Sequence, residues 1–223
     1  MLRRVVVFDT GWGGEAFADY LEKELSVVQV IRVIDWRNAP YCNKRKRQIQ
    51  ELVEEALAEY IDMVDAIVLA SNVVSAAALW YLRTKHPNQI FVGTSWPTIR
   101  RKDFQKNVLM LTTRSVRRSR DFAALKRRWN GLKMQIVECD EWVDLIDDGE
   151  MTPGIMRHEF IHARVERPDI VVLGCTHLLA ERDAIEGIFG WRARVADGNK
   201  NMLKNLCRAL ELRGGDGEYH ITE

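Results

Sequence analysis

Short, unbroken runs of apolar residues alternate along the chain with segments in which apolar residues recur at helical spacing. Runs of this length, with apolar residues on both faces, are typical of strands in a parallel sheet that is covered on both sides. Helical spacing is clearest at residues 15–25 and 47–60. Strands that alternate with helices predict an α/β fold with mainly parallel sheets. The predicted strands are residues 4–9, 27–35, 66–71, 90–94, 107–112, 134–138, 170–175 and 193–197.

Polar side chains gather where four of these apolar runs end. In a parallel α/β sheet, ligands bind beyond the carboxyl ends of the strands, so these positions are candidates for a functional site. Ser, Thr, Asn and Asp also cap helices, and for any single position a cap is an equally good explanation. Four such ends in one chain favour a site over caps alone. The residues concerned are Asp9, Thr10, Ser71, Asn72, Thr112, Thr113, Ser115, Cys175, Thr176 and His177.

Two of these strand ends resemble each other. The segments "AIVLASNVVSAAAL" (residues 66–79) and "DIVVLGCTHLLAERDAI" (residues 169–185) share one pattern. Each has an apolar run, a small residue, a Ser-Asn or Cys-Thr pair, and then a helix-like segment. Such a weak internal repeat predicts a two-lobed protein that brings the two strand ends face to face across a cleft.

Composition and charge narrow the classes of function. The chain has 223 residues and a formal net charge of +1, which argues against a protein whose main task is to coat nucleic acid. No segment approaches the ~20 apolar residues of a membrane span, and the N-terminal apolar run is too short for a signal peptide. We therefore expect a cytoplasmic protein with no membrane partner. The cysteines are Cys42, Cys139, Cys175 and Cys207; none is in a CxxC pair, so free thiols are expected.

One segment carries a competing signature, that of a zinc protease. Residues 158–162 read H-E-x-x-H, which places His158 and His162 on one face of a helix with Glu159 beside them. Glu181 follows at a spacing that the third ligand takes in some of these proteases. Residues 169–175 lie between, however, and indicate a buried strand where that class needs helical support for the glutamate. We therefore favour no metal site here, with zinc-dependent hydrolysis as the alternative.

Six motifs resemble those of glutamate racemases, in the same order along the chain. "VVVFDTGWGGEAFADYL" resembles their Asp-Ser-Gly-x-Gly-Gly opening, "APYCNKRKRQI" their Pro-Tyr-Gly loop, and "VLASNVVSA" their Ala-Cys-Asn-Thr-Ala-Ser segment. "ECDEWVDLIDDGE" resembles their Cys-Pro-x-x-x-Pro-x-x-Glu region, with Asp147 at the glutamate. "VVLGCTHLL" is nearly identical to their second cysteine motif, and "VADG" resembles their closing Asp-Ser. From about residue 4 to residue 200, the chain therefore resembles the aspartate/glutamate racemase family.

The resemblance implies a fold and an activity. The fold would consist of two pseudo-symmetric, flavodoxin-like α/β lobes, with the active site in the cleft between them. Residues 1–95 plus 196–223 would form the first lobe, and residues 96–195 the second. The activity would be that of an isomerase acting at the α-carbon of glutamate, aspartate or a related carboxylate, with no cofactor or metal. Family members are frequently dimers, so we expect a homodimer.

Proton transfer at an α-carbon needs a base on one face, an acid on the other, and donors for the carboxylates. A thiol suits both roles, because its ordinary pKa of about 8.5 can be tuned by neighbours. By motif match, Cys175 is the principal acid/base and exchanges a proton with His177. Ser71 and Asp9 would face the other side of the substrate, and Asp147 would support His177 or the pocket. The matched substrate-binding positions are Thr10, Gly11, Pro40, Tyr41, Asn72, Thr112, Thr113, Ser115 and Thr176.

Three positions depart from the family pattern. Ser71 replaces the first cysteine of the family pattern. A hydroxyl is a much weaker acid than a thiol, and each unit of pKa difference adds about 1.36 kcal/mol to the cost of removing its proton. Val73 replaces a threonine. Cys42 replaces the glycine of the Pro-Tyr-Gly loop, either as a packing residue or as a second thiol in a new position. Our leading hypothesis is a racemase, slow or asymmetric; a single-cysteine decarboxylase or lyase and a non-catalytic carboxylate-binding protein are the alternatives.

Overall fold

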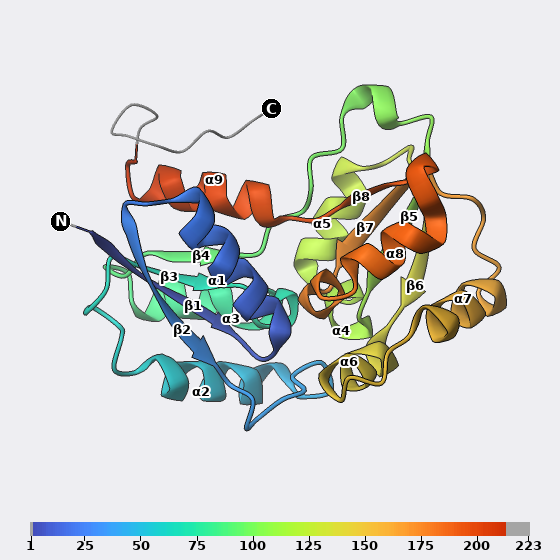
Figure 1. The fold of residues 1–223 in the computed structure, drawn as a ribbon. Coiled ribbons are helices and arrows are strands. Elements are labelled where there is room, and N and C mark those ends of the chain that lie inside the picture. The colour runs from blue at the N-terminus through green and yellow to red at the C-terminus, as the bar shows by residue number, and fades with distance from the viewer. Residues whose placement is uncertain (1, 213–223) are drawn as a thin grey trace.

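Two parallel four-stranded sheets form the two lobes of the protein, which lie side by side in Figure 1. The computed structural model describes residues 2–212. The strand orders are β2-β1-β3-β4 and β6-β5-β7-β8, so both sheets have the same topology when each is numbered from its own first strand. The strands are β1 (Arg3–Asp9), β2 (Val28–Ile34), β3 (Ala66–Leu69), β4 (Phe91–Gly93), β5 (Asn107–Thr112), β6 (Lys133–Glu138), β7 (Ile170–Gly174) and β8 (Arg194–Ala196).

Helices cover both faces of each sheet, as a mainly parallel sheet requires. In the first lobe, α1 (Trp12–Glu24) and α9 (Asn199–Ala209) lie on one face, and α2 (Lys46–Leu57) and α3 (Asn72–Lys85) on the other. The helices of the second lobe are α4 (Arg114–Arg117), α5 (Arg120–Arg128), α6 (Asp140–Asp147), α7 (Pro153–His162) and α8 (Arg182–Phe189). Short 3-10 helices are η1 (Arg101–Asp103), η2 (Thr176–Leu179) and η3 (Gly190–Arg192).

The strand β1 explains why the apolar runs are unbroken. Successive side chains of a strand point to opposite faces of the sheet. Val5 and Val7 pack with α1 and α9, whereas Val6 and Phe8 pack with α2 and α3. All four side chains are fully buried. A strand covered on both faces has no solvent-facing position, and therefore no polar alternation.

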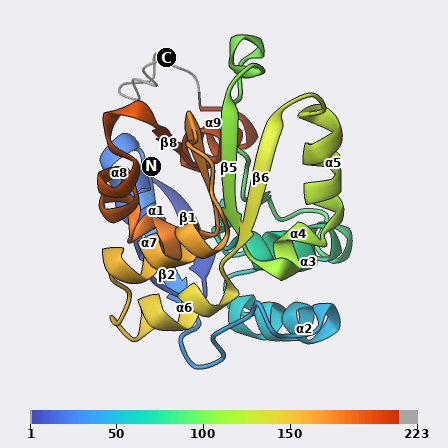
Figure 2. The ribbon, with the colours of Figure 1, turned by 90° about the vertical axis from the view of Figure 1, so that its right-hand side faces the viewer.

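The second lobe is built in the same way. Leu109 and Leu111 of β5 face the cluster formed by α6, α7 and α8, and Val108 and Met110 face α5. Figure 2 shows the sheet between α5 on one side and α7 and α8 on the other. The two lobes thus have separate cores, and the space between them is free to hold a site.

The predicted elements are confirmed, with one difference in detail. All eight strands occur within two residues of their predicted bounds, and the segments with helical spacing form α1 and α2. After Cys175, however, the chain first makes the 3-10 helix η2, and α8 begins only at Arg182. This tight turn puts Thr176 and His177 directly against the glycine-rich loop of the first lobe.

The chain passes between the lobes at two places within the described residues, after β4 and after β8. The two connections touch. A Cβ on Gly198 would lie 2.6 Å from the carbonyl carbon of Ser95, and closer still to its oxygen. The Asn201 side chain donates to the carbonyl oxygen of Trp96 at 2.7 Å, and that of Asn205 donates to the Ser95 hydroxyl at 2.9 Å. The paired connections therefore form one narrow bridge.

Helix α9 packs in the core of the first lobe, with Met202, Leu203 and Leu206 against β1 and β3. The lobe boundaries at residues 95 and 196 stay a prediction, and residues 213–223 of the expected first lobe lie outside the described residues. Among residues 2–212, no helix is long and apolar enough to span a membrane.

Candidate active site

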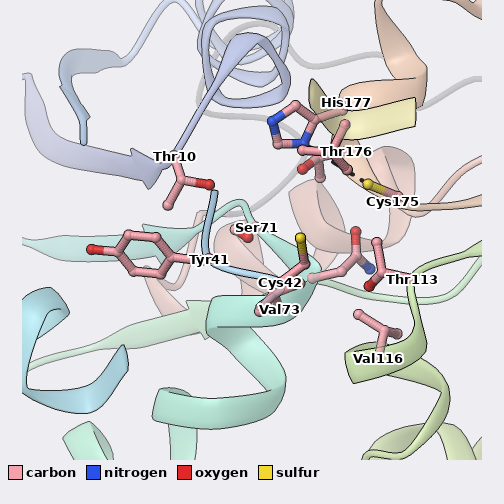
Figure 3. A pocket seen from close by; sticks show the side chains of 12 residues that line it. Thr10, Tyr41, Cys42, Ser71, Val73, Thr113, Val116, Cys175, Thr176 and His177 are labelled. Carbon is pink, nitrogen blue, oxygen red and sulfur yellow. Dashed lines mark hydrogen bonds between the residues drawn. The ribbon is translucent and has the colours of Figure 1, made fainter. Parts of the chain in front are cut away.

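A narrow pocket lies between the lobes, at the carboxyl ends of strands from both sheets (Figure 3). Its empty volume, including the opening to solvent, is about 310 Å³. All four polar strand ends contribute to it: those of β1, β3, β5 and β7. The lining residues are Thr10, Tyr41, Cys42, Ser71, Asn72, Val73, Thr113, Val116, Val143, Cys175, Thr176 and His177.

Most of the predicted site residues line this pocket, and the others lie just behind its wall. Thr112 donates its hydroxyl to the Gly174 carbonyl at 3.2 Å, and Ser115 bonds the Thr113 hydroxyl at 3.1 Å. Pro40 stands in the loop before Tyr41 and accepts from the Lys44 ammonium at 3.1 Å. The predicted residues that do not line the pocket are Asp9, Gly11, Pro40, Thr112, Ser115 and Asp147.

Two lining residues carry no signal that sequence reasoning could have used. Val116 lies on the short α4 and Val143 on α6, and both are buried. An apolar side chain at such a position looks the same whether it faces a core or a pocket. Such walls are found only when the fold is known.

A thiol, an imidazole and a carboxylate form a line at the second-lobe side of the pocket. The Cys175 sulfur lies 3.8 Å from His177 Nδ1, and His177 Nε2 lies 3.4 Å from a carboxylate oxygen of Asp147. The second approach is an ion pair rather than an aligned hydrogen bond, since Nε2 has no hydrogen-bond partner among the described residues. Burial alone would lower the pKa of His177, but Asp147, Cys175 and Asp9 together raise it to about 11. The imidazole is therefore a cation at neutral pH, and it can donate its Nδ1–H toward the sulfur.

Asp9 is fully buried behind the pocket, at the end of β1. One of its oxygens accepts from the Thr10 N–H at 2.7 Å, and the other has no hydrogen-bond partner among the described residues. Burial raises the pKa of Asp9 to about 6, in opposition to the positive charge of His177 and to the hydrogen bond from the Thr10 N–H. The electrostatic partners of Asp9 thus come from the Cys175 side of the pocket.

Gly11 and Gly13, at the start of α1, permit contact between the lobes. A Cβ on Gly11 would lie 3.1 Å from Cδ2 of the His177 ring, and closer still to Nε2. A Cβ on Gly13 would lie 2.7 Å from the carbonyl carbon of Thr176. Both distances are shorter than ordinary carbon–carbon contacts of ~3.5–4.0 Å. These glycines are therefore needed for space, and they set how closely the lobes approach.

Ser71 caps the helix α3, as strand-end serines often do. Its side-chain oxygen accepts from the Val74 N–H at 3.4 Å, and the residue is buried. Asn72, Val73 and Ser71 together bring the N-terminus of α3 to the pocket. Backbone N–H groups at the start of a helix are a ready site for an anion such as a carboxylate.

The loop that follows β2 brings Tyr41 and Cys42 to the pocket. Asp35 holds this loop by accepting from the Tyr41 hydroxyl at 2.6 Å and from the Asn38 side chain at 2.9 Å. The Lys44 N–H then bonds the Tyr41 carbonyl at 3.1 Å. Cys42 is half-buried, and Figure 3 shows its sulfur directed into the pocket, on the same side as Ser71.

The H-E-x-x-H segment, residues 158–162, does not line this pocket. His158 and His162 stack edge to face on the exposed surface of α7, with ring centroids 5.5 Å apart. Within the described part of the chain, no group of three or more His, Cys, Asp or Glu side chains is placed to hold a metal ion.

Fold and site together define a class. Two like α/β lobes face each other over a pocket with a thiol, an imidazolium and carboxylates, and with hydroxyl and N–H donors around them. Such a set of groups suits proton transfer on a small carboxylate. The protein therefore belongs with two-lobed α/β proteins that carry acid–base chemistry in the cleft between their lobes.

Comparison with known proteins shows what the chain is similar to. No protein-family model matches the chain. The chain is 29% identical to the glutamate racemase of Bifidobacterium longum subsp. infantis over 93% of its own length and 85% of the relative's, and 27% identical to that of Sulfurovum sp., with 95% and 84% covered. The structure of Escherichia coli glutamate racemase, bound to L-glutamate and the activator UDP-MurNAc-Ala, matches with a TM-score of 0.84 and 23% identity over 98% of this chain and 86% of that one.

Aspartate racemases share the fold as well. The Picrophilus torridus enzyme matches with a TM-score of 0.65 and 16% identity over 95% of both chains. The chain is thus similar to glutamate racemases over nearly its whole length, and it shares its fold with glutamate and aspartate racemases.

Proposed function

We propose that this protein is a cofactor-independent amino-acid racemase with glutamate as its substrate. The observation that carries the proposal is the line of Cys175, His177 and Asp147 at a pocket between the lobes. Relatives that match nearly the whole chain are glutamate racemases, and two of the similar solved structures hold L-glutamate or D-glutamate. The substrate fits the charge of the site, since helix N-termini and hydroxyl groups bind carboxylates.

In this proposal, the Cys175 sulfur takes or returns the α-proton on one face of the substrate. The His177 imidazolium is its counter-ion when the sulfur is a thiolate, and the Nδ1–H group can donate toward Sγ, which lies 3.8 Å away. Asp147 keeps His177 charged and oriented through the ion pair at Nε2. General acid–base catalysis by a positioned group of this kind contributes about 10²–10⁴-fold to a rate.

The substrate carboxylates would be held by donors on both sides of the pocket. The N-terminus of α3 and the Asn72 amide lie on the first lobe, and the hydroxyls of Thr113 and Thr176 on the second. Donors aimed at a carboxylate also stabilise the negative charge that spreads onto it when the α-proton leaves. Ligand binding and transition-state stabilisation would thus use the same groups.

The test is solvent exchange at the α-carbon. Wild-type protein in deuterium oxide, given L- or D-glutamate, should lose the α-proton signal in NMR spectra, and the opposite enantiomer should appear on a chiral column. Cys175→Ser should lower both rates by about 100-fold or more. Cys207→Ala is the matched control, because Cys207 is buried in the first-lobe core, away from the pocket. Absence of exchange with any acidic amino acid in wild-type protein would refute the proposal.

The two alternatives from the sequence analysis are not favoured, because the similar sequences and the similar solved structures cited above are racemases. Loss of CO₂ from a malonate-type acid would revive the single-cysteine decarboxylase. Ligand-induced thermal stabilisation unchanged in Cys175→Ser, without exchange, would revive the binding protein. The homodimer and the cytoplasmic location stay predictions, to be checked by solution mass and by cell fractionation.

A further inference from the structure

Inversion at a carbon needs an acid/base group on each of its two faces. The second lobe supplies Cys175 and His177 on one side of the pocket. The group on the other side must come from the first lobe. The first-lobe residues that line the pocket are Thr10, Tyr41, Cys42, Ser71, Asn72 and Val73.

Most of these side chains are unsuited to exchange a proton with carbon. Asn72 and Val73 have no titratable group. The Tyr41 hydroxyl is bound to Asp35 at 2.6 Å and points away from the pocket in Figure 3; burial and that carboxylate hold the pKa of Tyr41 far above its usual range. Thr10 and Ser71 are aliphatic alcohols, much weaker acids than a thiol, and the Ser71 oxygen already accepts from the Val74 N–H.

Cys42 has the chemistry that the others lack, and its place fits. Its sulfur is directed into the pocket beside Ser71, across from Cys175 (Figure 3). The two sulfurs are close enough to interact electrostatically, and Asp140 and Asp144 of α6 act on Cys42 as well. The hydrogen bonds of Asp35 to Tyr41 and Asn38 fix the loop that carries Cys42, so the thiol is held in position.

We propose that Cys42 is the acid/base of the first lobe, and that Cys42 and Cys175 form the pair that inverts the substrate. This inference rests on the proposed racemase function and assigns the second catalytic residue of that same site. Cys42 then does the work for which Ser71 is too weak an acid. Ser71 keeps its role as the cap of α3.

The step balances in protons and charge. The Cys175 thiolate takes the α-proton and becomes a thiol, and the electron pair of the C–H bond spreads onto the substrate carboxylate. The Cys42 thiol gives its proton to the opposite face of the same carbon and becomes a thiolate. The product is the other enantiomer, and the two sulfurs have exchanged protonation states. The reverse turnover restores the starting state, and so does loss of the Cys175 proton to solvent together with uptake of a solvent proton by Cys42.

The electrostatics of the two sides support this division of roles. Burial, with the charges of Asp140, Cys175 and Asp144, raises the pKa of Cys42 to about 11. Cys42 therefore holds its proton at neutral pH and starts as the donor. We assign the acceptor role to Cys175, because the imidazolium of His177 lies 3.8 Å from its sulfur and would serve as the counter-ion of a thiolate. The enzyme should act faster on the enantiomer whose α-hydrogen faces Cys175.

The experiment compares inversion with exchange in deuterium oxide, for L- and D-glutamate separately. The proteins are wild type, Cys42→Ser, Cys42→Gly, the double variant Cys42→Gly/Ser71→Cys, and the control Cys207→Ala, each checked for folding by thermal melting. Both single variants at Cys42 should lose inversion by about 100-fold or more. They should still exchange the α-proton of one enantiomer without inverting it, through Cys175. The double variant should invert the substrate at least tenfold faster than Cys42→Gly, because it returns a thiol to the first lobe.

Three results would overturn the inference. Inversion by folded Cys42→Ser within threefold of wild type would show that Cys42 is dispensable, and would leave the proposed function intact. An equal loss of inversion and of exchange for both enantiomers in the Cys42 variants would assign Cys42 a structural role. Wild-type protein that neither inverts nor exchanges glutamate would overturn the proposed function, and this inference with it.

Discussion

Replacement of Gly13 by alanine tests whether the approach of the lobes is set by space alone. Gly13 lies in the first turn of α1 with an ordinary helical backbone, so alanine suits its conformation. The new Cβ, however, would lie 2.7 Å from the carbonyl carbon and 2.8 Å from the carbonyl oxygen of Thr176. Neither atom belongs to a flexible side-chain end. The lobes, or the Thr176 backbone, must therefore move.

The size of the effect follows from these distances. A normal carbon–carbon contact needs ~3.5–4.0 Å, so the required displacement is about 1 Å. Overpacking of this kind costs about 1–3 kcal/mol, offset by up to ~1 kcal/mol from the better helix propensity of alanine. A displacement of about 1 Å at a catalytic site can cost about 100-fold in rate. We expect racemase kcat/KM to fall by about 100-fold, with stability lowered by about 2 kcal/mol or less.

Gly187→Ala is the matched control for this change. Gly187 also lies in a helix, α8, and a Cβ there would have no atom within 4 Å. This variant should gain up to ~1 kcal/mol of stability and keep its activity. Urea denaturation and racemisation rates would be measured for both proteins. If Gly13→Ala is stabilised as much as Gly187→Ala and retains kcat/KM within threefold of wild type, the lobes do not meet as described.

Three further predictions concern the charges and the cap at the site. The raised pKa of Asp9 means that the folded state binds this proton more tightly than the unfolded state does, so up to about 3 kcal/mol of stability is lost as pH rises from about 4 to about 6. Asp9→Asn should abolish that loss when stability is measured by urea denaturation at each pH. An unchanged slope of stability against pH would contradict the prediction. Asp147→Asn should lower the pKa of His177 from about 11, measured by NMR titration of the imidazole; an equal or higher value would show that Asp147 does not hold the charge. Ser71→Ala should lower the free energy of unfolding by about 1 kcal/mol, because it removes the cap on the Val74 N–H. Urea denaturation curves that match wild type would show that the cap does not stabilise the protein.

The fold was accessible from sequence because its strands are buried on both faces. Val5, Val6, Val7 and Phe8 leave no gap in the pattern, and the same holds for β5 and β7. The polar residues at the strand ends were accessible for a related reason: a parallel sheet collects all its carboxyl ends at one edge. The pocket accordingly holds Thr10, Ser71, Thr113 and Cys175 together, as that rule predicts.

What the sequence did not provide are the contacts between the lobes. The Gly13–Thr176 contact joins residues far apart in the chain, and no local pattern encodes it. The surroundings of Asp9 are also nonlocal: its charge acts on His177, whereas the sequence expectation grouped it with Ser71. The direction of the Cys42 side chain depends on hydrogen bonds within one loop, which Asp35 organises. Such details follow from tertiary geometry rather than from propensity.

The bridge of two touching connections is the place about which the two lobes would rotate if the cleft opened. Ser95 and Gly198 border the pocket region next to Cys175 and Thr176, so a hinge at this bridge runs close to the second-lobe thiol. The loop that carries Cys42 lies by α6, on the side of the molecule away from the bridge in Figure 1. When one rigid body swings about a hinge, the parts farthest from the pivot travel most. Rotation about the bridge would therefore move the Cys42 loop away from α6 by more than it moves the residues next to Ser95 and Gly198, and it would increase the distance between the two sulfurs.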